Sequence, residues 1–183
     1  MPFDIIETYK KNDGQKIHIK MTFADSWQAI KYDAEKEGAY NSTYHINTLQ
    51  NVDRKAVDVV AVCPQNVMVL IEVKEESSVN LLHITQKYYD TIAGMVCAWM
   101  SGKDELAKIS KPVFNSEKPK IQAVLLIVNS TASSDTTKGA LSQIAMMAIG
   151  DAMQNRLAPL GIRSRVRYLS SPSSEFGWEA RRI

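Results

Sequence analysis

Two carboxylates and one ammonium group form the most chemically capable part of this sequence: Asp58, Glu72 and Lys74. In a β-strand, side chains two residues apart point to the same face, so Glu72 and Lys74 would share one face of a strand. Carboxylates leave water at a high cost unless they are paired or bind a metal ion. Hard oxygen ligands suit Mg²⁺ or Mn²⁺, so these residues predict a site for one of these cations.

The chain around these residues has the pattern of an antiparallel hairpin. Two β-branched runs, Ala56–Val62 and Val67–Val73, flank a short break that contains a proline and an asparagine. A turn centred on the middle of this break would place Asp58 directly opposite Glu72. Cross-strand partners of this kind have Cβ atoms only about 4.5–5.5 Å apart, and two like charges so placed repel each other. We therefore expect a positive group between them, and Lys74 is the one that the hairpin itself supplies.

An Asp on one strand and a Glu-x-Lys on the next resembles the PD-(D/E)XK nuclease superfamily, and the resemblance covers this hairpin alone. It implies a hydrolase, a Mg²⁺-dependent phosphodiesterase in which Asp58 and Glu72 hold the metal ion, with the Val73 carbonyl as a further ligand. It also implies that Lys74 orients or helps to deprotonate the attacking water and stabilises charge on the phosphate. Val57 stands where the family motif has proline. The alternative is a charged strand end without a catalytic role.

The neighbouring helices supply further candidates. The family often adds an acidic residue from its first helix, which here is Glu35 or Glu37; Glu37 lies closer to the apolar face and is favoured, with a solvated helix end as the alternative. Some branches of the family carry a Gln and a Tyr on the helix after the motif strand. Gln86 matches the first, whereas Asp90 stands in the Tyr place. Gln86 and Lys87 are therefore candidate contacts to phosphate or water.

Three arginines alternate with other residues in a predicted strand: Arg163, Arg165 and Arg167. Alternate residues of a strand lie on one face, about 6.5–7 Å apart. Guanidinium groups at this spacing could follow the phosphate backbone of a nucleic acid. An edge strand protected by charge against aggregation has the same pattern, so both interpretations stay open.

Composition limits the class of protein. With 183 residues and 45% hydrophobic content, the chain fits one globular domain. The net charge of +2 is nearly neutral, so contact with phosphates must depend on local patches. Cys63 and Cys97 have no metal-ligand spacing and are expected to be reduced core residues. Neither a signal peptide nor a membrane-spanning apolar run is evident, so we expect a cytoplasmic protein.

The pattern of the whole chain predicts a single α/β domain. We expect an αβββαβ core, as in the restriction-endonuclease-like fold, with a mixed central sheet flanked by helices on both faces. An N-terminal hairpin extension (1–24) precedes this core (25–170), and a tail (171–183) follows it. The expected elements are a hairpin of Ile5–Tyr9 and Lys16–Phe23, a helix Trp27–Glu37, a strand Thr43–Leu49, the motif hairpin, a helix Leu81–Met100, a helical turn and loop within 103–120, a central strand Ile121–Val128, a helix Ala140–Leu157 and a strand Ile162–Leu169.

These features favour a metal-dependent nuclease that acts on DNA rather than RNA. One alternative is a non-catalytic protein of the same fold, serving as a nucleic-acid-binding or assembly module. Another is an unrelated α/β protein with a chance motif. A homodimer or a partner protein is left open, and a membrane is not expected.

Overall fold

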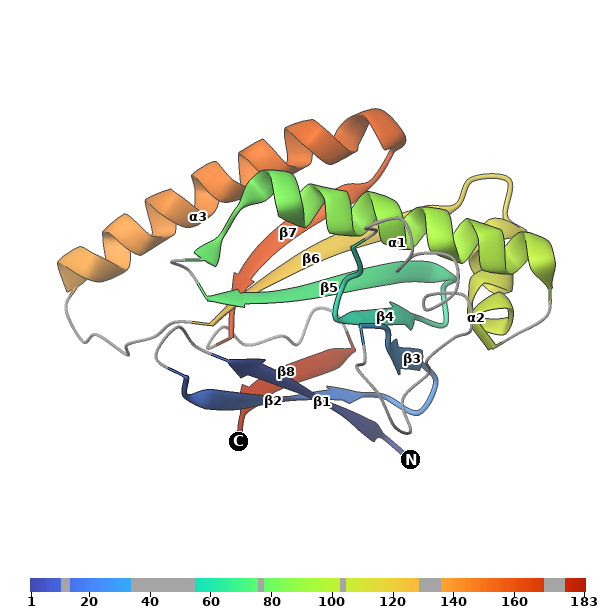
Figure 1. Ribbon diagram of the computed structural model, residues 1–183, viewed down its shortest axis with the longest axis horizontal. Helices are drawn as coiled ribbons and strands as arrows, with labels where there is room; N and C mark the ends of the chain where they lie inside the picture. The colour runs from blue at the N-terminus through green and yellow to red at the C-terminus, as the bar shows by residue number, and fades with distance from the viewer. Residues whose placement is uncertain (11–13, 34–54, 76–77, 103–104, 129–135, 170–176) are drawn as a thin grey trace.

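The computed structural model describes residues 1–10, 14–33, 55–75, 78–102, 105–128, 136–169 and 177–183, and Figure 1 shows its elements. The strands are β1 (Phe3–Lys10), β2 (Lys16–Phe23), β3 (Gln28–Lys31), β4 (Val59–Val62), β5 (Val67–Glu75), β6 (Lys120–Val128), β7 (Arg163–Tyr168) and β8 (Trp178–Arg182). The helices are α1 (Leu81–Ser101), α2 (Glu105–Phe114) and α3 (Thr136–Leu157), followed by a 3-10 turn, η4 (Ala158–Leu160).

A five-stranded mixed sheet in the order β3-β4-β5-β6-β7 forms the middle layer. Its first three strands are antiparallel neighbours, whereas β6 and β7 run parallel to β5. The β4–β5 register pairs Val59 with Ile71, as predicted, and so brings Asp58 to the level of Glu72. Helices α1 and α2 connect β5 to β6, and α3 connects β6 to β7, because a parallel crossover needs a dozen or more residues. The predicted central strand, β6, lies inside this sheet.

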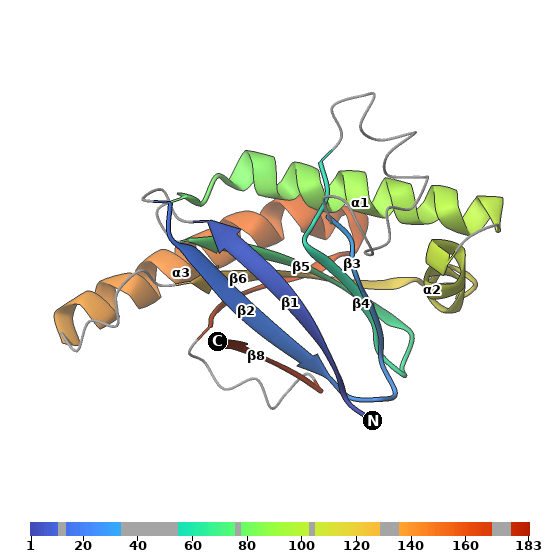
Figure 2. The same cartoon turned by 60° about the horizontal axis from the view of Figure 1, so that its bottom comes forward.

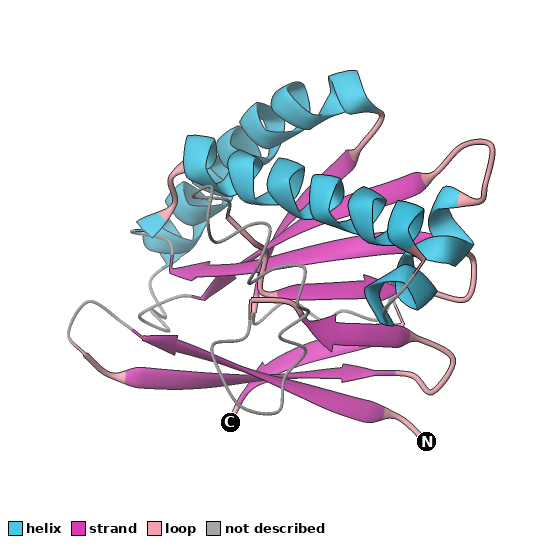
Figure 3. Cartoon of the chain, turned by 45° about the vertical axis from the view of Figure 1, so that its right-hand side comes forward, coloured by secondary structure: helices cyan, strands magenta, loops and turns pink. Residues whose placement is uncertain are grey.

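The two faces of the five-stranded sheet have different covers, as Figures 1 and 3 show. Helices pack on one face, where Met68 and Leu70 of β5 join their apolar cluster. Val69 and Ile71 point the other way and pack with Phe23 of β2. The expectation of helices on both faces is therefore wrong for the described part of the chain. The second face is covered by a three-stranded sheet, β1-β2-β8, whose inward residues supply the apolar surface that a helix would otherwise provide.

This three-stranded sheet joins the two ends of the chain. Strand β2 pairs with β1 in the predicted hairpin and with β8 on its other side, as Figure 2 shows. The ring of Phe23 stacks on Phe3, with centroids 5.6 Å apart, and on Trp178, with centroids 5.8 Å apart. We predicted residues 171–183 as a tail, but their last part is the paired strand β8. Burial of the Trp178 indole beside Phe23 explains why this segment is fixed.

The helix predicted at Trp27–Glu37 is wrong over its described residues, where β3 stands instead. Ala29 packs with the three-stranded sheet, whereas Ile30 packs with the helices, so successive residues face opposite layers. Pairing of Ile30 with Val60 adds β3 to the edge of the five-stranded sheet. The remainder of that helix and the strand predicted at Thr43–Leu49 lie outside the described residues.

The other helices agree better with the sequence. The Asn80 side chain caps α1 by accepting a hydrogen bond from the His83 amide at 3.2 Å, and α1 ends before Gly102 in the left-handed conformation. Helix α2 replaces the single helical turn predicted between α1 and β6, and α3 begins at Thr136 rather than Ala140. Within the described residues, no helix has the length and apolar character needed to cross a membrane.

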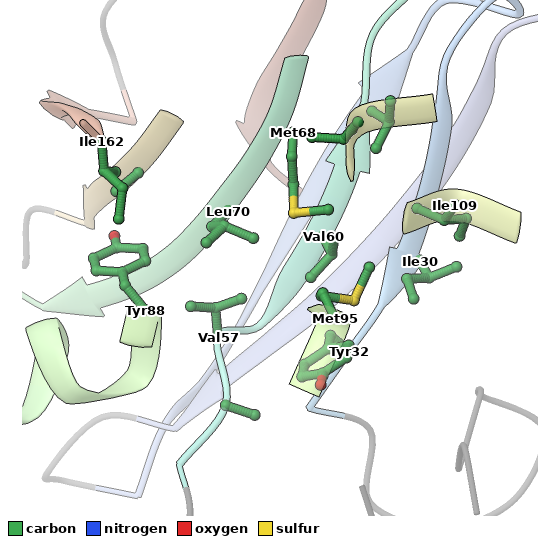
Figure 4. Close-up of a cluster of buried hydrophobic side chains, with 14 of the residues drawn as sticks. Ile30, Tyr32, Val57, Val60, Met68, Leu70, Tyr88, Met95, Ile109 and Ile162 are labelled. Atoms are coloured by element: carbon green, nitrogen blue, oxygen red, sulfur yellow. The ribbon is translucent and has the colours of Figure 1, made fainter. Parts of the chain in front are cut away.

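A buried stripe fixes α1 against the sheet. Ile84, Tyr88 and Met95 are almost wholly buried, and Figure 4 shows Tyr88 and Met95 within this cluster. The Tyr88 hydroxyl donates a hydrogen bond to the Val124 carbonyl at 2.8 Å, which ties the helix to β6. Burial raises the pKa of this phenol well above its ordinary value. Cys97, predicted as a core residue, lies off the stripe and is exposed.

Replacing Gly177 with alanine should destabilise the fold by about 1–3 kcal/mol. Gly177 has φ +70°, and an added Cβ would lie 3.0 Å from the Trp27 indole nitrogen. Gly150→Ala in α3 is the matched control, because its Cβ would make only an ordinary contact, 3.8 Å from Val166. Alanine in a helix interior is favoured over glycine by about 1 kcal/mol. Urea unfolding should show a lower midpoint for Gly177→Ala and a higher one for Gly150→Ala. Equal midpoints would contradict this account of Gly177.

Candidate functional site

Glu72 is a fully buried carboxylate near the end of β5. It shares the helix-facing side of the strand with Leu70, and its exposed fraction is 0%. Two ammonium groups lie against the same oxygen: Lys74 Nζ is 2.9 Å and Lys87 Nζ is 2.7 Å from Glu72 Oε1. The other oxygen, Oε2, is buried and accepts no hydrogen bond from the described residues. Glu72 therefore has one neutralised oxygen and one with unused coordinating capacity.

Asp58 comes directly before β4 and turns its side chain toward β5. Its carbonyl accepts a hydrogen bond from the Tyr32 amide at 2.8 Å, which extends the β3–β4 pairing. Its Oδ2 accepts a hydrogen bond from the Val73 amide at 2.6 Å. The carboxylate thus occupies the place that a backbone partner of Val73 would have taken in a longer β4. This contact holds Asp58 beside Glu72, on the same side of the sheet, as the hairpin register predicted.

Lys87 is the main positive group between the two carboxylates. It reaches down from α1, and its Nζ lies 2.7 Å from Glu72, 4.0 Å from Asp58 and 3.9 Å from Asp33. The need for a cation was predicted, but the hairpin's own Lys74 was expected to meet it. Lys87 was predicted to contact nucleic acid; in the structure its ammonium group lies against the acidic pair, and it also borders the adjoining cavity. Burial lowers the pKa of Lys87, but attraction by Glu72, Asp58 and Asp33 outweighs burial and leaves that pKa raised.

The pKa of the Asp58 carboxyl is raised well above its ordinary value of 3.8. Burial is the largest cause, and repulsion by the Glu72 and Glu7 carboxylates adds to it. Lys87 and the Val73 amide act in the opposite direction without cancelling these effects. A proton on Asp58 is therefore stabilised at pH values where a solvated aspartate would be ionised, as expected for two carboxylates in close proximity.

Sequence reasoning missed two acidic residues of the site, Glu7 and Asp33. Glu7 comes from β1; Lys31 Nζ lies 3.1 Å from its Oε2, and burial raises its pKa. The alternation along β1 could have shown Glu7, because it shares the inward face of the strand with Ile5 and Tyr9. No comparable signal exists for Asp33. Asp33 comes two residues after the end of β3, so its position depends on the path of the backbone there and not on strand alternation.

A cavity of about 300 Å³ opens beside the acidic pair. Lysines from three segments line it together with the start of α1 and the end of β1: Tyr9, Lys55, Lys74, Ser78, Asn80, His83, Ile84 and Lys87. Tyr9 donates a weak hydrogen bond to Glu75, at 3.4 Å, and so links the N-terminal hairpin to the end of β5. Among the described residues, the lining therefore carries three ammonium groups and no carboxylate, an arrangement that attracts anionic ligands. Asp58 and Glu72 are linked to the cavity through Lys74 and Lys87.

The remaining predicted residues fall into three groups. Gln86 is half-buried on α1, outside the cavity lining, and the structure does not bring it to the acidic pair. Glu35 and Glu37 lie outside the described residues. The arginine row belongs to the opposite face: Arg165 pairs with Val124 and Arg167 with Leu126, and both partners pack toward the three-stranded sheet.

The residues present fit a hard divalent cation only in part. Asp58 and Glu72 offer carboxylate oxygens, and Glu72 Oε2 has no hydrogen-bond partner among the described residues. Within those residues, no set of three His, Cys, Asp or Glu side chains is arranged as metal ligands. A cation at this site would need the Val73 carbonyl or water to complete its coordination, which Mg²⁺ commonly accepts.

Comparison of the chain with known protein families, with curated proteins and with solved structures finds no match. The function of the acidic pair must therefore be judged from its own chemistry, its cations and the adjoining cavity.

In metal-free buffer, Asp58→Asn should make the protein more stable at pH 8. Because the pKa of Asp58 is raised on folding, its contribution to stability is complete below pH 3.8 and is lost as pH rises through the raised pKa. Asparagine mimics the protonated acid and can still accept the Val73 hydrogen bond. The gain in melting temperature should shrink as pH falls toward 4. The exposed Asp151→Asn is the control and should show no such trend; an Asp58→Asn variant less stable than wild type at pH 8 would contradict the assignment.

Lys87→Met should destabilise the protein more than Lys74→Met. Lys87 has the less exposed side chain, 16% against 26%, and it neutralises three carboxylates rather than one. Loss of a charged partner from a buried group costs about 1–3 kcal/mol. The double variant leaves Glu72 without a cation and should cost about 3–5 kcal/mol. Urea unfolding at pH 7 measures each value, and a Lys87→Met variant as stable as wild type would show that the ion pair has no structural role.

Proposed function

We propose that the protein is a metal-dependent nuclease that hydrolyses phosphodiester bonds, in DNA more readily than in RNA. The observation that supports this most is the pair of adjacent carboxylates, Asp58 and Glu72, with an unpartnered Glu72 oxygen and Lys74 next to it. The lysine-lined cavity beside the pair suits a phosphate group. An acidic pair alone would repel such a substrate, so the surrounding ammonium groups are part of the proposal.

Asp58 and Glu72, with the Val73 carbonyl, would hold Mg²⁺ or Mn²⁺. Such an ion, when bound, polarises the phosphate and stabilises negative charge in the transition state. Asp58 is held in place for this role by the Val73 amide, so its carboxylate needs little reorganisation.

Lys74 is proposed to act on the reacting groups. Its Nζ lies beside Glu72 and also borders the cavity, so it can contact a phosphate oxygen or orient a water molecule there. Attack of this water on phosphorus forms one P–O bond and breaks another, and the leaving oxygen takes up a proton. A fixed ammonium group stabilises the charge that develops on the phosphate during this exchange. Lys55 and Lys87 would attract and position the substrate.

The order of elements also supports this function. Strands β3, β4 and β5, helix α1 and strand β6 follow the βββαβ part of the resembled fold, with Asp58 before the second strand and Glu72 and Lys74 in the third. The five-stranded mixed sheet is compatible with that fold. Helix α2 is an addition between α1 and β6. A reduced, cytoplasmic setting is part of the proposal, since Cys63 and Cys97 form no disulfide.

One observation favours a second function, a non-catalytic nucleic-acid-binding or assembly module. Lys87 Nζ lies 2.7 Å from Glu72 and therefore already neutralises the carboxylate that a metal ion would need. In a module without catalysis, this ion pair would be a structural element. Metal binding distinguishes the two functions, because a metal ion must compete with Lys87 in the first and has no site in the second.

Lys74→Ala should lose about 10²–10³ in cleavage rate while keeping its metal ion. Asp58→Asn should instead weaken metal binding, because it removes a charged ligand. Cleavage is measured with Mg²⁺ or Mn²⁺ on supercoiled plasmid, linear duplex DNA and RNA, and metal binding by calorimetry. Lys108→Ala, an exposed lysine on α2, is the matched control and should cleave as wild type does. Wild-type cleavage by Lys74→Ala would exclude the proposed mechanism.

Millimolar Mg²⁺ or Mn²⁺ should raise the melting temperature of the wild-type protein. A ligand at a hundred times its dissociation constant stabilises the folded state by about 2.7 kcal/mol. The rise should be smaller for Asp58→Asn and larger for Lys87→Met, which lacks the competing ammonium group. No rise in any of the three, together with intact binding of DNA, would favour the non-catalytic module.

A further inference from the structure

A second charged surface lies apart from the acidic pair, at the start of the parallel strands. It is a groove of about 570 Å³ lined by four cationic side chains and no carboxylate. The cationic residues are Lys118, Lys120, Arg163 and Arg165, and the rest of the lining is Val67, Pro119, Ile121, Gln122 and Gly161.

The sheet register explains why these cations gather. Strands β5, β6 and β7 are parallel, so they begin at the same edge, with Val67 paired to Lys120 and Gln122 paired to Arg163. Side-chain alternation then places Lys120, Gln122 and the two groove arginines on one face. Arg163 and Arg165 are exposed, as expected on the edge strand β7. Arg167, the third arginine of the row, is half-buried and lies outside the groove lining.

This groove is separate from the candidate active site. Glu72 comes five residues after Val67 on β5, which is about 16 Å along a strand. The two sites also occupy opposite faces, because Gln122 and Arg165 align with residues packed toward the three-stranded sheet, whereas Glu72 faces the helices. A ligand of the groove therefore binds without touching Asp58 or Glu72.

We infer that the groove binds the phosphodiester backbone of a nucleic acid. Three of its cations lie on adjacent strands, Lys120 on β6 and Arg163 and Arg165 on β7, and Lys118 comes just before β6. This spread suits a ligand with repeated negative charges rather than a single anion. Guanidinium groups match phosphate oxygens in bidentate geometry, and lysines add less directional attraction. The lining contains no aromatic ring on which a base could stack. The groove thus contacts the backbone and has little means of recognising sequence.

The inference concerns a tethering surface and does not require the acidic pair to be catalytic. DNA binding is measured in EDTA, where no divalent ion supports cleavage. A loss of groove binding and a lack of nuclease activity are therefore separate results. Fluorescence anisotropy of a labelled duplex, and of the matching single strand, is measured over a series of salt concentrations. Each duplex phosphate contact contributes about 0.9 to the slope of log K against log salt.

The groove variant is Lys120→Ala combined with Arg163→Ala, both at exposed positions. It should weaken binding and reduce the slope by up to about 1.8 for duplex DNA. The control, Lys108→Ala combined with Lys111→Ala on α2, loses the same charge and should keep the wild-type slope. An equal loss in both variants would overturn the inference, since net charge alone would then explain binding. Competition by polyglutamate as effective as by unlabelled DNA would also overturn it, in favour of an acidic protein partner.

Discussion

Burial of the Glu72 carboxylate is the constraint on which the rest of the site depends. An ionised carboxylate with no exposure cannot be stable beside apolar strands unless cations replace its hydration. Lys74 meets this need from the same strand, and Lys87 meets it from α1. Helix α1 must therefore lie over β5 with the Lys87 side chain directed toward Glu72. The Tyr88 hydrogen bond to Val124 and the buried stripe of α1 hold it in that position.

Under the proposed function, the same ion pair has a second consequence. A divalent cation and Lys87 would compete for the Glu72 carboxylate. Lys87 would therefore neutralise Glu72 when no metal ion is bound, and the metal ion would do so when it is bound. When the metal ion is bound, the lysine gains freedom to contact a ligand in the cavity that it already borders. Both the stability of the metal-free site and the binding of an anionic substrate would then depend on Lys87. A lysine suits this role better than an arginine, because its flexible ammonium group has no fixed planar partner.

The sequence predicts those parts of the site that depend on local periodicity. Asp58, Glu72 and Lys74 come together through strand alternation and one hairpin register, both readable from neighbouring residues. The role of Lys87 could not be predicted, because it depends on the rotation of α1 relative to β5, which distant core contacts determine. Strand β3 was missed for a related reason. Its four residues carry too short an alternation to outweigh a helical pattern, and pairing with β4 decides their conformation.

From the near-neutral net charge we predicted that any contact with phosphates depends on local patches, and the structure separates its charged groups into such patches. Negative groups gather on the helix-facing side near the end of β5, whereas the groove cations gather on the other face at its beginning. The separation of about 16 Å along the strand exceeds the screening length of about 8 Å at physiological salt. The acidic pair therefore cancels little of the field at the groove. A chain with a net charge of +2 can in this way carry both the cationic groove proposed to bind a phosphate backbone and the acidic pair proposed to hold a divalent cation.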